Sequence, residues 1–440
     1  MNKRLYMMAE GTVNKSLIYL SVPTIVGLLI TGFYNLVDSY FVAKLGTEAM
    51  SAISVVYPLL TLVPGIGLLF GNGGSAFISE LLGAKKKEKA EEVLATTFFI
   101  CLFFSFLLQL ILFKLPQLLV FLGASENVLP ISLDYSYILI LSFIFHIPSV
   151  CLMNLVRAEG ALKLSTLSQV LGAVLNIILD PIFIFYFNWG IKGAAIATSI
   201  SQFISFSILL LYYLTNKSYL KLSLNNIKIK LWILKPTLKV GIPLFAINFF
   251  QSFSLSATNI VAAPYGDNLV ASLGIANRVV GLSTFVVTGF SRGYQTFISY
   301  NYGAKRMDRV KDATKKAFTW GIGGGLVLTF LQIILSSSIV KAFSKDINVI
   351  DLGIKSLFGA SLFFFLYGFQ AIAIVYLLCI KYSKEGFLFS IARQGLIFLP
   401  VLFIDKIFFG VSGIIFAQGI SDIITTMFII LFLYKIHNWQ

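Results

Sequence analysis

The chain has 440 residues, of which 58% are hydrophobic and only 12% are charged, and its formal net charge is +15. A soluble domain carries roughly 25% charged residues, so this composition excludes an ordinary soluble protein. The three cysteines and two histidines are scattered and form no metal-binding or disulfide pattern. We therefore expect neither an enzyme nor a bound cofactor.

Runs of about 20 apolar residues recur along the whole chain, and each is long enough to cross a bilayer as a helix. The alternation of apolar and polar residues that is typical of barrel strands is absent. The sequence thus predicts an all-α polytopic membrane protein with twelve transmembrane helices. We place them at residues 15–44, 52–82, 93–115, 131–156, 163–187, 192–214, 236–263, 271–301, 314–340, 352–380, 386–408 and 410–435.

The second half of the chain repeats the first half at an offset of 220 residues. The repeated residues include Pro23 and Pro243, Gly46 and Gly266, and Gly83-Ala84-Lys85 and Gly303-Ala304-Lys305. A duplicated, apolar chain predicts two pseudo-symmetric lobes, which is how many transporters are built. We assign helices 1–6 to an N-lobe at residues 1–215, and helices 7–12 to a C-lobe at residues 236–440. Residues 216–235 form a basic, polar cytoplasmic linker.

The cations are distributed unevenly among the loops between these helices. They gather on alternate loops, at residues 3–4, 85–89, 157–163, 217–239, 305–316 and 381–384. This asymmetry is typical of cytoplasmic loops, so it predicts that both termini are cytoplasmic. The basic loops then set topology and meet lipid headgroups, and they do not indicate nucleic-acid binding. No GxxxxGK[ST] motif is present, so we expect no nucleotide and an ion gradient as the energy source.

Charged side chains are rare inside a bilayer and indicate function by default. Asp38 and Asp180 lie in apolar runs, with Tyr34 four residues before Asp38 and Asn176 four residues before Asp180, and Thr198 lies at a comparable depth. Two close carboxylates in surroundings of low dielectric constant cannot both ionise without a large cost in free energy. The pair could therefore bind a proton or, together with the amide and hydroxyl oxygens, Na⁺. The alternative is that Asp38 is an interfacial helix-end acid and that Asp180 caps a helix broken by proline.

The second half lacks this pair of acids, because the 220-residue offset places Thr258 and Pro400 at the equivalent positions. It holds instead a set of charged residues, namely Arg278, Arg292, Arg393 and Asp422. Arg393 and Asp422 are predicted to neutralise each other as a structural pair, and the arginines are also candidates for contact with a substrate.

Several short motifs resemble the MATE (multidrug and toxic compound extrusion) family. They are Ser21-Val22-Pro23-Thr24, Tyr34-Asn35-Leu36-Val37-Asp38, Leu82-Gly83-Ala84-Lys85, Gly241-Ile242-Pro243 and Tyr300-Asn301-Tyr302-Gly303-Ala304-Lys305. The resemblance covers essentially the whole chain and is greatest to the bacterial MepA-like exporters, near the DinF-like branch. It implies a rocker-switch antiporter that expels cationic, amphipathic compounds.

The resemblance also implies roles for particular residues. The cation site of the DinF-like branch falls here on Asp38, Asn176, Asp180 and Thr198, with a further network asparagine at Asn154 and the proline of the bending first helix at Pro23. The NorM-like branch adds an acid on helix 7, where this chain offers only Gln251 as the nearest polar candidate. Arg292 also departs from related exporters, which often carry a neutral polar residue there.

These observations predict a cation-coupled multidrug efflux antiporter in the bacterial cytoplasmic membrane. Its partners would be cationic drugs, lipid and a coupling ion, H⁺ or Na⁺, and we expect a monomer. The rival reading is a flippase for lipid-linked oligosaccharides, whose anionic pyrophosphate would require arginines such as Arg278, Arg292 and Arg393.

Overall fold

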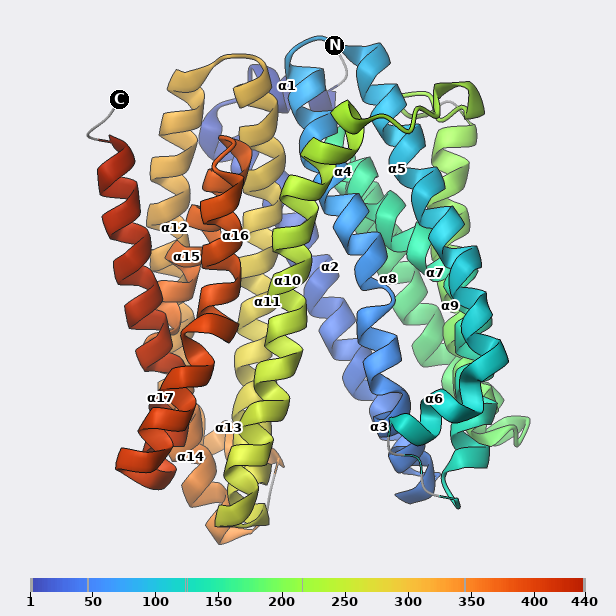
Figure 1. Ribbon diagram of the computed structural model, residues 1–440, viewed down its shortest axis with the longest axis vertical. Coiled ribbons are helices and arrows are strands. Elements are labelled where there is room, and N and C mark those ends of the chain that lie inside the picture. Colours follow the sequence, from blue (N-terminus) through green and yellow to red (C-terminus); the bar gives the residue numbers. More distant parts are fainter. Residues whose placement is uncertain are drawn as a thin grey trace. The chain divides into compact units, whose positions relative to one another are not determined.

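The computed structural model describes residues 3–437 apart from 46, 123, 125, 216, 344 and 345. Within these ranges the structure describes the backbone but not the side chains of residues 3–5, 35, 36, 39, 40, 43, 47, 48, 50, 51, 54, 57, 58, 61, 248, 252, 263, 267 and 437. The described residues form helices joined by turns and contain no β-strand (Figure 1). The predicted all-α fold class is therefore confirmed.

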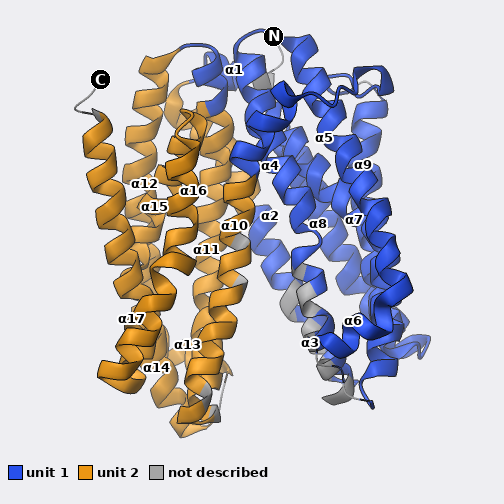
Figure 2. Ribbon diagram, viewed as in Figure 1, with its two compact units in different colours: residues 1–11, 26–241, 299–305 blue, residues 12–25, 242–298, 306–440 orange. Residues whose placement is uncertain are grey.

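The chain folds into two compact units (Figure 2). Unit 1 consists of residues 1–11, 26–241 and 299–305, and unit 2 consists of residues 12–25, 242–298 and 306–440. Three helices contribute residues to both units, namely α2 (Val13–Ala43), α10 (Leu231–Ala262) and α11 (Asp267–Gly303). The lobe boundaries at residues 215 and 236 stay predictions.

The remaining helices of unit 1 run from α1 to α9. They are α1 (Lys3–Ala9), α3 (Thr47–Leu62), α4 (Gly65–Gly83), α5 (Lys87–Leu107), α6 (Leu115–Phe121), α7 (Leu129–Ala158), α8 (Leu162–Pro181) and α9 (Gly190–Leu214). Short 3₁₀ turns cover Leu108–Lys114 and Leu224–Asn226, and a π-helical turn, Ile182–Tyr186, follows α8. Helix α7 packs on α4, α5, α8 and α9, so it is the central element of this unit.

The remaining helices of unit 2 run from α12 to α17. They are α12 (Met307–Ile334), α13 (Ser336–Phe343), α14 (Ile347–Ser361), α15 (Phe364–Cys379), α16 (Ser383–Ile391) and α17 (Phe398–His437). A 3₁₀ turn covers Ala263–Tyr265, and a π-helical turn, Ala392–Leu396, joins α16 to α17. Helix α15 packs against α12, α16 and α17.

Ten segments of the described chain are long and apolar enough to span a bilayer. Two features account for the difference from the twelve predicted spans. Pro64 has no N–H to continue a helix, so the second predicted span is divided into α3 and α4. The last segment, Ser383–Ile436, combines two spans, and Gly410 separates them with a left-handed φ of 56° that favours glycine. The twelve-helix plan is consistent with this arrangement.

The repeated Gly-Ala-Lys motif has the same conformation in both copies. Lys85 and Lys305 both have a φ of 59°, and each lies two positions after the last residue of its helix. A Cβ added at Gly83 would lie 1.8 Å from the carbonyl oxygen of Tyr300, and one added at Gly303 would lie 1.9 Å from that of Glu80. The two copies therefore meet backbone to backbone inside unit 1, and only glycine permits this approach.

The segment that follows α9 is fastened to unit 1. Glu159, directly after α7, is only 2% exposed, and it accepts hydrogen bonds from Ser218 Oγ (2.9 Å) and from the backbone N–H of Tyr219 (2.9 Å). Further along, Lys228 Nζ forms an ion pair with Glu92 at 2.5 Å. These contacts make residues 217–230 part of the surface of unit 1.

Burial of Glu159 raises the pKa of its carboxyl group, although the hydrogen bonds that it accepts act in the opposite direction. This residue lies just outside the span Leu129–Ala158.

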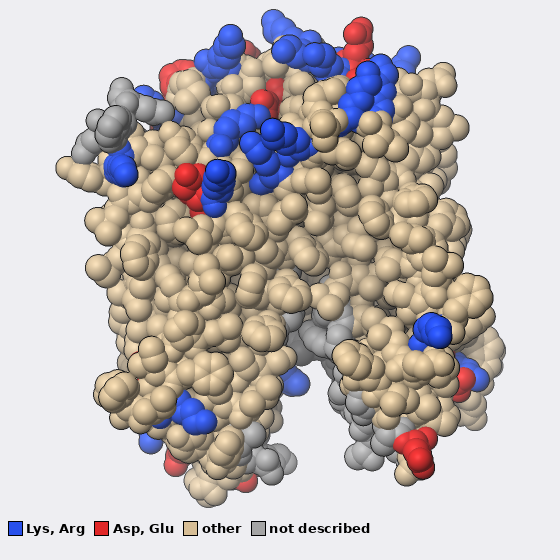
Figure 3. Space-filling model, in the orientation of Figure 1, with Lys and Arg blue, Asp and Glu red and all other residues tan. Residues whose placement is uncertain are grey.

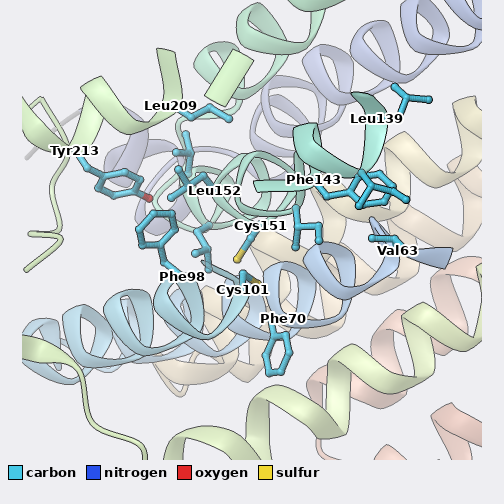
Figure 4. Close-up of a cluster of buried hydrophobic side chains, with 14 of the residues drawn as sticks. Val63, Phe70, Phe98, Cys101, Leu139, Phe143, Cys151, Leu152, Leu209 and Tyr213 are labelled. Atoms are coloured by element: carbon cyan, nitrogen blue, oxygen red, sulfur yellow. The ribbon is translucent and has the colours of Figure 1, made fainter. Parts of the chain in front are cut away.

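A large apolar cluster fills unit 1 (Figure 4). It includes Phe98 and Cys101 from α5, and Phe143 and Cys151 from α7. On the face drawn in Figure 3, lysines and arginines gather mainly at one end, and most of the remaining surface carries neither basic nor acidic side chains. Many of the exposed side chains are large and hydrophobic. An apolar outer surface of this kind suits contact with lipid.

Candidate functional site

Two carboxyl groups from different helices of unit 1 lie together. Asp38 is on α2 and Asp180 is near the C-terminal end of α8, and their side chains are within hydrogen-bonding reach of each other. Asp180 is fully buried, and Asp38 is partly buried. Like charges this close repel each other in buried surroundings, which favours the binding of a proton or another cation between them.

An amide links Asp180 to a third helix. Asn176 lies one helical turn before Asp180 on the same face of α8, and its Nδ2 donates to Asp180 Oδ1 at 3.2 Å. The same nitrogen donates to Thr198 Oγ1 on α9 at 3.3 Å. Both hydrogens of the amide are thus used, and they fix the carboxyl group of Asp180 relative to α9.

Several oxygens of this cluster are buried and have no hydrogen-bond donor among the described residues. They are Asp38 Oδ1, Asn176 Oδ1 and Asp180 Oδ2. An unsatisfied buried acceptor costs about 1–3 kcal/mol, so oxygens left in this state in one cluster point to a ligand. Oxygen ligands of this kind suit a proton or a hard cation such as Na⁺. The described residues contain no cluster of three or more histidine, cysteine or acidic side chains that could bind a metal ion.

Two tyrosines border the acids. Tyr34 on α2 and Tyr135 on α7 both lie close enough to Asp38 and Asp180 to interact with them electrostatically. Tyr34 was among the predicted residues, whereas the sequence interpretation missed Tyr135. The available signal was a polar face on α7, where Ser132, Tyr135 and Ser136 recur at helical spacing and are all buried.

Asn154 is not part of this cluster. Its Nδ2 donates to the carbonyl oxygen of Val150 at 2.8 Å, and its Oδ1 accepts from Arg157 Nη1 at 3.1 Å, so both hydrogen bonds stay within α7. Asn154 follows Tyr135 by 19 positions on the same helix, a rise of about 28 Å. These hydrogen bonds place Asn154 outside the acid cluster, and the network role that the resemblance implied for it stays a prediction. Pro23 lies inside α2, in the part that belongs to unit 2.

Unit 2 contains a buried ion pair between Arg393 and Asp422. Arg393 Nε donates to Asp422 Oδ1 at 2.7 Å, and Arg393 Nη2 donates to Oδ2 at 3.3 Å. Gln418, one turn before Asp422 on α17, donates to Oδ1 at 3.1 Å. The guanidinium carbon of Arg393 also lies 4.1 Å from the ring centroid of Tyr367. The structure thus brings the predicted pair together and adds two side chains that the sequence interpretation did not name.

Of the other three residues singled out in the second half, two are exposed and one borders a neighbour of this pair. Arg278 on α11 and Gln251 on α10 are exposed. Arg292 on α11 is partly buried and interacts electrostatically with Tyr367, so it borders the same tyrosine as Arg393.

The MatE family model matches residues 23–182 and 243–404, one match in each half of the chain. Fold and family therefore agree on the class of molecule, a multi-pass membrane transporter. The chain belongs to the MatE family.

Similarity to characterised relatives extends over the full length. The chain is 30% identical to the multidrug export protein MepA of Staphylococcus aureus (strain N315), over 99% of this chain and 97% of MepA. It is 28% identical to MepA of Staphylococcus saprophyticus with the same coverage.

Solved structures show the same fold. A MATE in complex with MaL6 has a TM-score of 0.93 at 21% identity and covers 98% of both chains. A multidrug resistance MATE family transporter in an outward-facing conformation has a TM-score of 0.93 at 22% identity, with 98% of this chain and 97% of that chain covered.

Proposed function

We propose that this protein is a multidrug efflux antiporter that exports cationic, amphipathic compounds in exchange for H⁺ or Na⁺. The MepA relatives, which are multidrug export proteins, support the transport class. The observation that carries the coupling mechanism is the acid cluster of unit 1, in which Asp38 and Asp180 lie together with unpaired oxygens. An external cation binds these oxygens and neutralises the repulsion between the acids.

The coupling follows from differential binding. The cation stabilises the conformation in which the acids are close together, and the drug stabilises the other conformation. A ligand can shift such an equilibrium only by the difference between its affinities for the two states. Alternation between the two conformations is the rocker switch. The two titratable acids make H⁺ a competent coupling ion, and the three unpaired oxygens make Na⁺ equally competent.

We place the protein in a bacterial cytoplasmic membrane as a monomer, with both termini in the cytoplasm and no resident cofactor. The asymmetry of basic loops supports this orientation. The flippase alternative is weakened because Arg393, one of its three candidate arginines, is neutralised by Asp422.

The test is transport of ethidium by the purified protein in proteoliposomes, with a pH gradient or a Na⁺ gradient imposed separately. The ion whose gradient drives transport is the coupling ion. Asp38→Asn and Asp180→Asn should each abolish gradient-driven transport in a folded protein. Asp134→Asn is the matched control, because Asp134 is also in unit 1 but is half-exposed and paired with Lys192 at 3.1 Å. Full transport by both Asp38→Asn and Asp180→Asn would contradict the proposed role of the acids.

A further inference from the structure

The centre of unit 2 has the composition of a site for an organic cation. Asp422 supplies a negative charge, Tyr367 supplies an aromatic face and Gln418 supplies an amide, and Asp422 is only 1% exposed. An aromatic face attracts a delocalised cation through its quadrupole, most strongly where water is excluded. A buried carboxylate beside such a ring is therefore well suited to a flat cation.

A flat cation already occupies this position, and it belongs to the protein. The guanidinium of Arg393 lies over the ring of Tyr367 and uses two of its nitrogens to hydrogen-bond the two oxygens of Asp422. This geometry satisfies charge, stacking and hydrogen bonding together. The arginine side chain thus indicates the chemistry of ligand that the site accepts.

Hydrogen-bonding groups near Asp422 remain unused when Arg393 is bound. Gln370 is fully buried, and its Nε2 donates to the backbone oxygen of Asp422 and to Thr426 Oγ1, both at 2.9 Å, yet its Oε1 has no donor among the described residues. Thr425 Oγ1, next to these groups in sequence, is likewise buried without a partner. Buried acceptors are normally satisfied, so the site has hydrogen-bonding capacity in reserve.

Arg393 lies at a backbone irregularity and is hydrogen-bonded along one edge. It lies in the π-helical turn Ala392–Leu396, a backbone irregularity that is frequent at functional sites. Its residue surface is 8% exposed, and its Nη1 makes no hydrogen bond to any described residue. Asp422 thus holds one edge of the guanidinium, and the other edge makes no hydrogen bond to the part of the chain that the structure describes.

The internal repeat gives independent support. Gln418 is equivalent to Thr198 at the 220-residue offset. Each of the two side chains belongs to the polar group around the buried acid of its own unit, since Thr198 is bonded to Asn176 and Gln418 is bonded to Asp422. The position of Thr198, which borders the acid cluster of unit 1, therefore has its counterpart in Gln418, which borders Asp422 in unit 2.

We propose that Asp422, Tyr367 and Gln418 form a binding site for flat organic cations, which Arg393 occupies as a tethered competitor. When a ligand displaces Arg393, Asp422 exchanges one cation for another and is never left as an unpaired buried charge. Only the class of ligand rests on the proposed export function; the site itself rests on the geometry of unit 2.

The experiment is a fluorescence titration of the purified full-length protein with ethidium. Arg393→Met removes the competitor and should tighten ethidium binding about tenfold or more, because ring and carboxylate both become available. Adding Asp422→Asn to Arg393→Met should abolish that gain. Lys311→Met removes an exposed cation from the same unit and should leave the affinity unchanged. In Arg393→Met, methylguanidinium at millimolar concentration should compete with ethidium, because it reproduces the missing side chain.

Arg393→Lys covers the case in which Arg393→Met does not fold. Lysine keeps the charge but lacks the planar fork, so it is a weaker competitor and should allow ethidium to bind several-fold tighter. Unchanged affinity in the folded variants would overturn the proposal and leave a purely structural ion pair. Failure of the wild-type protein to transport ethidium under either gradient would instead count against the export function, and the affinity comparison would still decide whether the site exists.

Discussion

The buried acids of the two units differ in their hydrogen-bond partners. In unit 1, Asp38 and Asp180 lie beside each other and each retains a buried oxygen without a donor among the described residues. In unit 2, both oxygens of Asp422 are bonded to Arg393, and Gln418 adds a third hydrogen bond. Among the described residues, the cluster of unit 1 has no cationic side chain bonded to its acids, whereas Asp422 of unit 2 is paired with Arg393.

This difference indicates how the two units of a duplicated fold can have different functions. An acid pair without a resident cation has to take an exchangeable one, which is the property that ion coupling requires. An acid with a tethered cation is stable when no ligand is present, because its charge is always compensated. We infer that unit 1 couples transport to the ion, and that unit 2 can hold an organic cation without becoming unstable when it is empty.

The largest expected effect separates the two clusters by stability. Arg393→Met leaves Asp422 as an uncompensated buried charge and should cost about 3–5 kcal/mol of folding stability. Asp180→Asn removes one of two mutually repelling groups, keeps an acceptor for Asn176, and should cost less than about 1 kcal/mol. Thermal unfolding in detergent micelles, compared at one pH and one lipid content, measures both.

A double variant sharpens this first prediction. Asp422→Asn combined with Arg393→Met removes both charges, so most of the lost stability should return. Equal losses in Arg393→Met and Asp180→Asn would contradict the comparison, because they would mean that the acids of unit 1 are paired as tightly as Asp422.

A smaller effect compares two positions that the repeat makes equivalent. Gln418→Leu removes a hydrogen bond to a charged acceptor and should cost about 1.5–3 kcal/mol. Thr198→Val removes a neutral acceptor that serves only Asn176, and should cost about 0.5–1.5 kcal/mol. The same unfolding measurement applies, and a greater loss from Thr198→Val would show that the cluster of unit 1 is the more tightly closed of the two.

The sequence predicts the helices and the two acid clusters for the same reason: apolar runs are long, and charges within them are rare enough to notice. Asp38, Asn176, Asp180 and Thr198 could be grouped in this way, and the structure places them together. Asp422 and Gln418 are four residues apart, so their contact was also predictable from helical spacing, although it was missed.

Other features have no comparable signal in the sequence. Tyr135 is one of 19 tyrosines, and only the packing of α2, α7 and α8 distinguishes it. Gln370 contacts Asp422 from another helix, about 50 positions earlier in the sequence, and Tyr367 on the same helix contacts Arg393, the partner of Asp422. Glu159 lies among basic residues, so its loop is easily interpreted as a signal of membrane topology alone. Its burial depends on Ser218 and Tyr219, which are about 60 residues later in the sequence.

Glu159 provides the smallest and most specific test, since it is an acid of unit 1 that is fully supplied with donors, in contrast to Asp180. Burial raises the pKa of Glu159 above the ordinary value of 4.5, so the folded protein binds this proton more tightly than the unfolded chain does. Its contribution to stability is therefore fully present below about pH 4.5 and is lost as the pH rises through the folded-state pKa.

Glu159→Gln is neutral at every pH and should lack this component while retaining contact with Ser218. The difference in unfolding free energy between wild type and variant should change across the transition, with the wild type relatively more stable at low pH. Unfolding midpoints measured from pH 4 to pH 8 report it, and Glu126→Gln, at an exposed acid of the same unit, should run parallel to the wild type. If Glu159→Gln and the wild type had the same pH profile of stability, residues 217–230 would not keep this carboxyl group buried. Glu159 and Asp180 would then differ less in their surroundings than their hydrogen bonds indicate.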